Sequence, residues 1–488
     1  MTSLHSVSSP EAQGLSSRAV TRFLDGCERA GLQMHAFQLL QRGHILAEGA
    51  WAPFRLEAPH ALYSVSKSFV STAVGFAVSD GLLGLDDPVL SFFPEHSPEL
   101  VGEHLAAMRV RDLLTMTTGH DEDPTDTMFG HQPQPWARTF LAQPVPHAPG
   151  THFVYNSAAT YILAATLERV SGQGLLDYLK PRLFGPLGIV GATWETNAEG
   201  APFGGWGLSL PVGALARLGQ LYLKRGVWEG VQLLPASWVE QATSAQVSSG
   251  DPDAPWDSAS DCSNDWAQGY GFQFWRCRHG AYRADGAFGQ SIVVMPTQQA
   301  VLAILSSVDD MQAVLDQVWT HLLPSFGDEP LQDDAEAAAH LREKCAELAL
   351  SALAGESHSP SAALLKGRSY VFGSNAWELE RLSFGELGAE VELTLTFSHG
   401  TYIHRAGFGA WSEHSTPGVF GRPLHWAGSA IWKSPMTLHL DLLELQNTGT
   451  LTLRLHPLDG GDRLKVEAEF LRTFRQSGLL SAVGSLEG

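Results

Sequence analysis

Ser64 and Lys67 stand three positions apart at the start of a segment, Tyr63 to Gly81, that is apolar nearly all round and is typical of a buried helix. At this spacing the two side chains share one helical face, so the amine can reach the hydroxyl. A serine alcohol needs a base to become nucleophilic, and a desolvated lysine can lose its proton and serve as that base. The alternative is an ordinary first-turn lysine. Burial of a lysine in so apolar a helix is costly without a purpose, which favours chemistry.

Two further segments carry weaker signals. Tyr155 comes just before a predicted helix over 157–171, where a tyrosine hydroxyl can act as an acid or base but more often packs. The segment Arg283-Ala-Asp-Gly-Ala-Phe-Gly-Gln290 lies between two predicted strands. Its glycines allow close backbone approach to a ligand, and a strand-edge amide there can stabilise an oxyanion. Alone, this segment is merely a turn.

The order of these three segments resembles the serine β-lactamase and penicillin-binding-protein superfamily, and more narrowly its class C branch with the esterase and D-peptidase relatives. The phrases at 110–120, 186–189 and 215–223 are similar to the same family. The resemblance covers roughly residues 10–325. It implies Ser64 as the acylated nucleophile, Lys67 as its proton partner and Tyr155 as a second general acid/base.

The resemblance also implies an oxyanion hole formed by the backbone amides of Ser64 and Ala287. The candidates for substrate contact are Asn156, Ser157, Asp285, Gly286 and His120.

Two departures from the family pattern bear on the substrate. The third motif usually opens with Lys or His, then Thr and Gly, where this chain has Ala284-Asp285-Gly286. The second often has Asn two residues after the Tyr, where this chain has Ser157, with Asn156 displaced by one. Loss of the cation removes the anchor for a penicillin or peptide carboxylate, which Asp285 would repel, while attracting a substrate amine. Arg283 lies on the same strand face as Asp285 and is an alternative source of positive charge.

The elements that position these residues predict a mixed α/β domain over 1–326, an antiparallel sheet flanked by helices. Strands are expected on both sides of a turn at Arg42-Gly43 within 36–51, and at 270–275, 292–295 and 300–306. Further helices are expected over 16–30, 110–116, 157–171, 211–224, 235–242 and 310–323. The polar stretch over 242–268 indicates a long surface loop.

The composition changes after residue 326. A helical linker over 327–365, with an alanine-rich helix at 331–354, leads to alternating apolar residues over 366–488. This alternation, with a hairpin turn at Asp459-Gly-Gly-Asp462, predicts a separate antiparallel β domain, a lipocalin-like barrel or a sandwich. Its aromatic residues are expected to fill the core rather than bind sugars; they are Tyr402, Phe408, Trp411, Trp426 and Trp432.

Charge and composition limit the partners. The 488 residues include 31 Lys and Arg against 52 Asp and Glu, a net charge of −21, which argues against nucleic acid and anionic membranes. The four cysteines have no metal-binding spacing, and the cluster His120 to Asp123 is interpreted as a solvated acidic loop, so neither a metal nor another cofactor is expected. With no visible secretion signal or membrane span, a cytoplasmic location is expected.

The sequence therefore predicts a serine hydrolase that cleaves a small-molecule ester or amide through a Ser64 acyl-enzyme, with an esterase favoured. A D-amino-acid peptidase or a weak β-lactamase is the alternative within this class. The alternative from another class is a catalytically idle scaffold whose β domain binds a partner. The joint presence of Ser64, Lys67 and Tyr155 counts against that scaffold. The natural substrate and the oligomeric state are left open.

Overall fold

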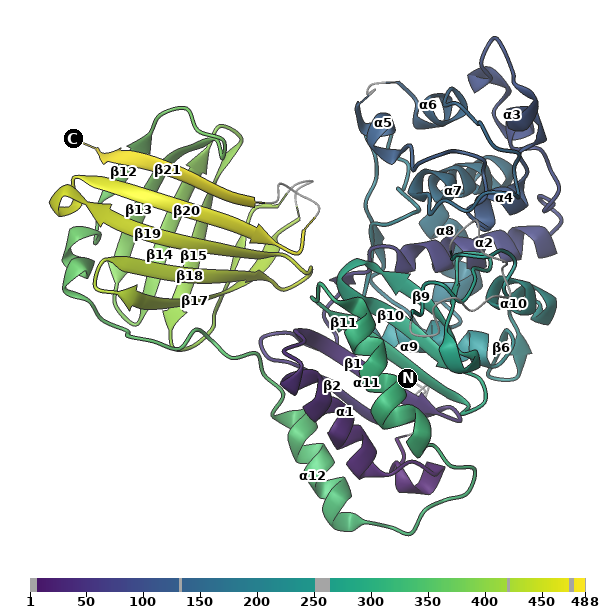
Figure 1. Cartoon of the computed structure of the whole chain (residues 1–488), viewed down its shortest axis with the longest axis horizontal. Helices are drawn as coiled ribbons and strands as arrows, with labels where there is room; N and C mark the ends of the chain where they lie inside the picture. Colours follow the sequence, from purple (N-terminus) through teal and green to yellow (C-terminus); the bar gives the residue numbers. More distant parts are fainter. Residues whose placement is uncertain (1–6, 131–133, 251–263, 419–421, 474–477, 488) are drawn as a thin grey trace. The chain divides into compact units, whose positions relative to one another are not determined.

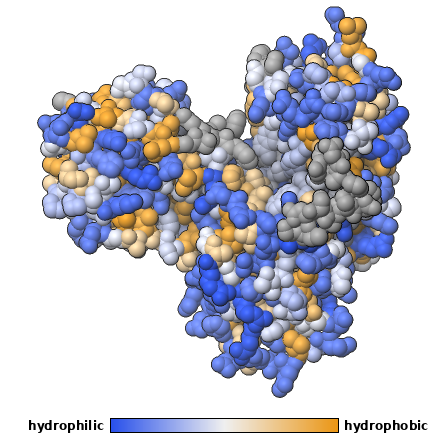
Figure 2. Space-filling model, viewed as in Figure 1, coloured by the Kyte–Doolittle hydropathy of each residue, from blue (hydrophilic) through white to orange (hydrophobic). Residues whose placement is uncertain are grey.

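The computed structural model describes residues 7–130, 134–250, 264–418, 422–473 and 478–487 (Figure 1). The chain divides into two compact units. Unit 1 comprises Met1–Gly49, Leu56–Ser306 and Asp310–Ala346, and unit 2 comprises Ala50–Arg55, Ser307–Asp309 and Glu347–Gly488. Figure 2 shows largely hydrophilic surface on each unit, with apolar residues scattered over it. Within the described ranges, no helix has the length and apolar character needed to cross a bilayer.

Unit 1 is built on a six-stranded sheet in which the N-terminal hairpin pairs with the last strands of the unit. Its strand order is β2 (His44–Ala50), β1 (Met34–Gln41), β11 (Ala300–Ser306), β10 (Gln290–Met295), β9 (Tyr282–Gly286) and β8 (Trp275–Arg276). β1 runs antiparallel to β11, with Leu39 opposite Leu302. Every residue of β1, β10 and β11 is buried, because helices cover the sheet. The predicted antiparallel sheet with flanking helices is confirmed.

The helices that matter for the site form where the sequence predicts them. They are α1 (Ser17–Arg29), α2 (Val65–Ser79), α4 (Val110–Leu114), α7 (Ser157–Ser171), α9 (Val212–Leu223), α10 (Ala236–Thr243) and α11 (Met311–Gln317). α9 packs on β1, β10 and β11, and the absence of a side chain at Gly219 permits this, since a Cβ there would lie 2.5 Å from Val301. α2 lies between β9 and β10 on one side and α7 and α8 (Leu175–Leu179) on the other. Short helices at α3 (Glu103–Ala107), α5 (Thr125–Gly130) and α6 (Trp136–Leu141) were not predicted.

Three predicted elements differ in extent. The strand expected at 270–275 is reduced to β8, because Gln273 takes a left-handed conformation (φ 63°) and its amide donates to the carbonyls of Leu113 and Leu114. The alanine-rich helix is α12 (Ala335–Ala346), which begins after Asp334, whose carboxylate accepts from the amide of Ala337. The helix predicted over 310–323 is α11 followed by a π-helical turn, Val318–Leu322. Residues 251–263 of the predicted surface loop lie outside the described residues.

Unit 2 contains a closed β-barrel, which settles the choice between a barrel and a sandwich. Neighbouring strands follow the order β15 (Gly400–Phe408), β14 (Glu390–Phe397), β13 (Leu379–Leu387), β12 (Ser369–Phe372), β21 (Gly478–Leu486), β20 (Arg463–Leu471), β19 (Thr450–Leu458), β18 (Thr437–Glu444) and β17 (Leu424–Ser434). The ring closes where β15 pairs in parallel with β17, Gly407 opposite Ser429. β16 (Ser412–Thr416) pairs with β17 outside this ring. The hairpin turn at Asp459–Gly461 is confirmed.

Apolar side chains at alternate positions of the strands fill most of the barrel interior. Leu393, Leu440 and Leu453 are almost completely buried in one core cluster, together with Trp432. The expectation that aromatic residues fill this core is confirmed for Trp432, whereas Trp411 packs in a separate cluster with Ala427 and Leu443. Phe408 and Trp426 also pack against the main core cluster, and Trp426 lines a cavity together with Tyr402.

The barrel seam depends on close backbone contact at Gly428. A Cβ at this residue would lie 2.0 Å from the carbonyl oxygen of Arg405 on β15. We therefore expect Gly428→Ala to lower the free energy of unfolding of unit 2 by about 1–3 kcal/mol, the usual cost of overpacking. Urea denaturation followed by tryptophan fluorescence measures this loss. The control is Gly388→Ala, since a Cβ at Gly388 meets nothing within 4 Å. Equal stability of the two variants would contradict this account of the seam.

Candidate active site

Ser64 is the residue directly before α2 and follows a tight turn of the chain. Tyr63 has a left-handed conformation (φ 48°), and Ser64 already has helical angles. The preceding strand, β3 (His60–Ala61), pairs with β5 (Leu208–Leu210), and this pairing fixes the residues just before the turn. Every α2 residue from 65 to 77 is buried, because this helix is apolar nearly all round. Because the helix is buried, Lys67 in its first turn lies in the protein interior.

The amine of Lys67 contacts groups from three parts of unit 1. It donates to the hydroxyl of Ser64 at 3.0 Å, the hydroxyl of Ser157 at 3.1 Å and the carbonyl of Gly205 at 2.8 Å. The side chain is only 1% exposed. Desolvation lowers the pKa of Lys67 from its ordinary value to about 7, and the negative charge of Asp123 opposes that shift. A large fraction of the amine is therefore neutral at neutral pH.

The same three contacts suit a neutral amine. The carbonyl of Gly205 only accepts hydrogen bonds, whereas a serine hydroxyl can donate or accept. A neutral amine with two hydrogens can donate to Gly205 and Ser157 and turn its lone pair toward Ser64. Ser64 then donates across the 3.0 Å contact, with the roles of the two groups exchanged. This is the geometry required of a general base acting on a serine.

Tyr155 completes the set around Ser64. Its ring stacks on Trp275, with centroids 5.5 Å apart, and the Lys67 amine lies 4.7 Å from its centroid. Desolvation raises the pKa of the Tyr155 hydroxyl well above its ordinary value, while a hydrogen bond with Ser64 opposes that rise. Tyr155 therefore keeps its proton at neutral pH, which suits a general acid rather than a base.

Ser157 and Asn156 have different places at the start of α7. The Ser157 hydroxyl meets Lys67, so this serine belongs to the cluster around Ser64. Asn156 is fully buried; its side-chain oxygen accepts from the amide of Ala159, and its amide donates to Thr118. The structure thus makes Asn156 the cap of α7 rather than a member of that cluster.

Asp123 is the functional neighbour that sequence reasoning missed. Its carboxylate accepts from the amides of Ser157, at 2.7 Å, and Ala158, at 3.3 Å. A carboxylate in this place neutralises the positive end of α7. The interpretation of His120 to Asp123 as a solvated loop is therefore wrong for Asp123, although Asp121 and Glu122 are exposed. Since 34 residues separate Asp123 from Ser157, no local pattern reveals this contact.

His120 lies inside the protein. It is 3% exposed, its Nδ1 is 2.8 Å from the hydroxyl of Thr118, and its ring packs near Phe140. Burial lowers the pKa of His120 to about 4, so the ring is neutral. Through Thr118 it reaches Asn156 and the start of α7, and the structure does not bring it to Ser64. In the described part of the chain, no three His, Cys, Asp or Glu side chains gather as metal ligands would.

Two glycines allow backbone segments to approach the nucleophile. A Cβ at Gly286 would lie 2.4 Å from the carbonyl of Leu62 and 3.2 Å from the amide of Val65, the residues that flank the Ser64 turn. The end of β9 therefore packs against the start of α2, with Ala287 as the next residue. A Cβ at Gly205 would lie 2.8 Å from the carbonyl of Ser157. The amides of Ser64 and Ala287 remain the predicted oxyanion hole.

Arg283 and Asp285 neutralise each other. Strand alternation places them on one face, as predicted, and Arg283 Nε donates to Asp285 at 2.6 Å. The guanidinium is fully buried and also donates to the carbonyl of Asp265 and the sulfur of Cys277. Arg283 is therefore not the free cation that the sequence left as an alternative. Nor is Asp285 a free anion, and Ala284 is fully buried beside them.

Aromatic side chains border the cluster. Tyr155 belongs to a group that packs around buried Tyr270 and Trp275. A second group follows Gly205: Trp206 stacks on Phe203, with centroids 4.6 Å apart, and Phe129 lies 6.0 Å from Trp206. Aromatic rings thus pack against Tyr155 and follow directly after Gly205 in the chain, and sequence reasoning did not assign these rings to the site.

Comparisons with known proteins match most of unit 1. The model of the β-lactamase family matches residues 18–323. The 6-aminohexanoate-dimer hydrolase of Paenarthrobacter ureafaciens is 28% identical over 295 residues, which cover 56% of this chain and 73% of that protein. The D-aminopeptidase of Brucella anthropi is 27% identical over 165 residues, which cover 32% of this chain and 31% of that protein.

Solved structures show the same fold. A putative 6-aminohexanoate-dimer hydrolase from Bacillus anthracis has a TM-score of 0.52 at 18% identity, with 70% of this chain and 88% of that chain covered. EstCE1, a hydrolase with promiscuous acyltransferase activity, has a TM-score of 0.52 at 18% identity, with coverages of 62% and 99%. The family match spans most of unit 1 and includes Ser64, Lys67 and Tyr155. The chain therefore belongs to the β-lactamase family of serine hydrolases.

Proposed function

We propose that this protein hydrolyses an ester of a small, uncharged, partly apolar carboxylic acid through an acyl-enzyme on Ser64. The observation that carries the proposal is the contact of 3.0 Å between the Ser64 hydroxyl and a buried amine whose pKa is about 7. A serine so placed has a base that is neutral and within reach at the pH of the reaction.

In the acylation step, neutral Lys67 takes the proton of Ser64 as the Ser64 oxygen attacks the substrate carbonyl. The carbonyl electron pair moves onto oxygen, where the amides of Ser64 and Ala287 donate hydrogen bonds to it. When that pair returns, the bond to the leaving group breaks, and Tyr155 gives the leaving group its proton. Lys67 returns its proton to Tyr155, which restores both groups. The alcohol departs and the acyl group remains on Ser64.

Water completes the cycle with Lys67 again as the base. It attacks the acyl carbonyl while neutral Lys67 accepts its proton, and the second tetrahedral oxyanion again faces the two amides. Collapse of this species breaks the bond to Ser64, whose oxygen recovers a proton from Lys67. The carboxylic acid product leaves, and no group of the protein is changed.

The charge around Ser64 supports an uncharged substrate. The Arg283–Asp285 pair has no net charge, so it offers no anchor to a carboxylate near the scissile bond. The ring of Trp275 stacks on that of Tyr155 and suits apolar substituents. An amide is the second candidate, because the similar 6-aminohexanoate-dimer hydrolase bears a name that denotes cleavage of a linked amino-acid dimer.

Loss of the nucleophile provides the first test. We expect Ser64→Ala to reduce ester hydrolysis by about 10⁴-fold or more, because the site holds no substitute nucleophile. Intact-mass analysis after a fluorophosphonate probe should show one adduct on the wild type and none on Ser64→Ala. The control is Ser237→Ala on exposed α10 surface, which should be labelled and active like the wild type. A labelled Ser64→Ala protein would assign the nucleophile to another residue.

The pH profile tests Lys67 as the base. Only the neutral amine can accept a proton, so kcat/KM should rise with pH and reach half its maximum near pH 7, where Lys67 titrates. Lys67→Arg should be inactive across this range, since a guanidinium stays protonated. Asp123→Asn removes a charge that raises the pKa of Lys67, so its profile should shift to lower pH. An unchanged midpoint in Asp123→Asn, or an active Lys67→Arg, would exclude this role of Lys67.

Substrate charge provides a further test. We expect the wild type to cleave neutral short-chain esters about 10- to 100-fold more efficiently than matched esters with a carboxylate near the scissile bond, since a charge-assisted hydrogen bond contributes about 1.5–3 kcal/mol. Asp285→Asn leaves the Arg283 charge uncompensated and should reduce this preference. The substitution Ala284→Lys would not restore a cation for the substrate carboxylate, because Ala284 is fully buried. A wild type that prefers the carboxylated series would show that a cation is supplied from elsewhere.

A further inference from the structure

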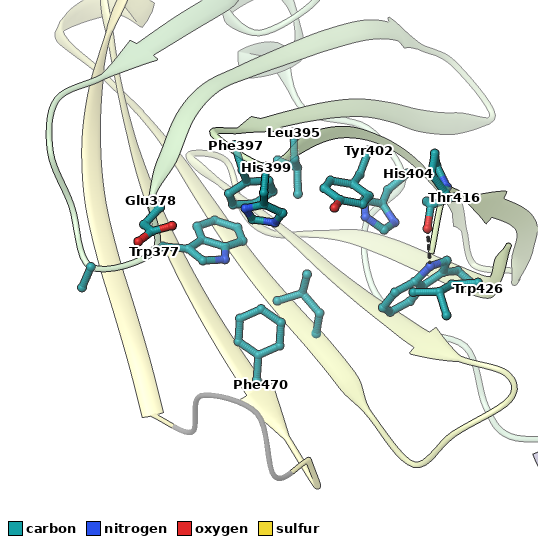
Figure 3. Close-up of a pocket in the computed structure, with 14 residues that line it drawn as sticks. Trp377, Glu378, Leu395, Phe397, His399, Tyr402, His404, Thr416, Trp426 and Phe470 are labelled. Atoms are coloured by element: carbon teal, nitrogen blue, oxygen red, sulfur yellow. Dashed lines mark hydrogen bonds between the residues drawn. The ribbon is translucent and has the colours of Figure 1, made fainter. Parts of the chain in front are cut away.

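The barrel of unit 2 has a cavity of about 460 Å³ at one end (Figure 3). Its lining comes from β14, β15, β16, β17, β19 and β20 and from the loop that leads into β13, all within unit 2. Its volume is that of a site for a drug-sized molecule. The cavity shares no residue with the Ser64 cluster, so the family of unit 1 does not account for it.

The cavity lies where the filled interior of the barrel gives way to incompletely packed rings. Along β14, Leu393 and Leu395 are buried, but the next inward residue, Phe397, is only half-buried. Along β20, Val466 and Ala468 are buried, but Phe470 is half-buried. Large apolar side chains that point inward yet keep exposed surface leave an unfavourable contact with water, which a bound apolar molecule removes.

The rings that surround this hollow also contact one another along its wall. Figure 3 shows Trp377, Phe397 and Phe470 converging on one part of it, with Trp426 further along. Trp377 meets Phe397 edge to face at 5.4 Å and Phe470 at 6.3 Å. Ring edges and faces turned toward a common space are the partners that an aromatic ligand prefers.

His404 and Trp426 in the cavity wall already have hydrogen-bond partners. His404 is 5% exposed, and its Nδ1 lies 3.1 Å from Nε2 of His414. Burial lowers the pKa of His404 to about 3, so its ring is neutral. Trp426 donates its indole hydrogen to Thr416 at 2.9 Å. Among the described residues that line the cavity there is no Lys or Arg, and the exposed carboxylate of Glu378 disfavours an anion.

We propose that this cavity is a binding site for an uncharged aromatic small molecule, separate from the Ser64 site. The size fits one such molecule, the rings supply its contacts, and the described lining offers an anion no Lys or Arg. The sequence-based expectation that the aromatic residues of this domain only fill its core is therefore incomplete.

The test uses the full chain with its catalytic serine blocked by the fluorophosphonate probe, so that the Ser64 site is filled. Titration with N-phenyl-1-naphthylamine, an uncharged fluorescent aromatic, should give saturable one-site binding. We expect Phe397→Ala to weaken this binding about tenfold or more, and Leu424→Trp, which fills the cavity from its edge, to abolish it. The matched control is Ile403→Ala: Ile403 lies between Tyr402 and His404 on β15 but is 48% exposed, and its loss should leave binding unchanged. Circular dichroism confirms that each variant is folded.

Ligand charge gives the second readout. In competition with the fluorescent probe, 2-acetylnaphthalene should bind at least about tenfold more tightly than 2-naphthoate, its anionic counterpart. Ester hydrolysis by Phe397→Ala should equal that of the wild type, which separates this site from the proposed function. Wild-type binding by both cavity variants, a preference for naphthoate, or no saturable binding by the wild type would each overturn the proposal.

Discussion

The desolvation of one amine organises the site. Lys67 lies in a helix whose residues from 65 to 77 are all buried, so its charged form is unfavourable and its pKa falls to about 7. Three hydrogen-bond partners compensate this burial, and each belongs to a different part of unit 1: Ser64 before α2, Ser157 at the start of α7, and Gly205 in the segment before β5. A lysine with fewer partners would destabilise the fold, and a solvated lysine would stay protonated. The same constraint therefore serves packing and chemistry.

Close backbone contacts bring these partners together. Side chains at Gly205 and Gly286 would collide with the carbonyls of Ser157 and Leu62. The lack of a side chain therefore lets the Gly205 segment meet the start of α7 and lets the end of β9 meet the Ser64 turn. Asp123 adds an electrostatic element, since its carboxylate accepts from the first amides of α7 and also raises the pKa of Lys67 against the effect of burial. The balance of these two effects places the pKa of the Lys67 amine near 7. The buried Arg283–Asp285 pair completes the arrangement without presenting a net charge to the substrate.

The two units solve the packing of apolar residues in different ways. In unit 1 the central strands β1, β10 and β11 are buried along their whole length, and β11 is apolar from Ala300 to Leu305. In unit 2 the sheet closes on itself at the β15–β17 seam, where Gly428 lets two backbones meet. Leucines fill the middle of this barrel and half-buried rings surround its cavity. The first arrangement surrounds the Ser64 cluster with packed elements, whereas the second leaves a cavity inside the barrel.

The sequence by itself determined the features that depend on short distances along the chain. A Ser-x-x-Lys on an apolar helix, a tyrosine before α7, the hairpin turn at Asp459 and the alternation of the barrel strands are local patterns, because helix and strand periodicity alone decides which side chains share a face. Only the tertiary structure decided the rest. Asp123 accepts a hydrogen bond from the amide of Ser157, which is 34 residues away in the sequence. The strand predicted at 270–275 is interrupted because the side-chain amide of Gln273 donates to a carbonyl of α4. Alternation likewise shows which barrel residues point inward, but the space they must fill depends on how the strands close, so the cavity beside Phe397 and Phe470 appears only in three dimensions.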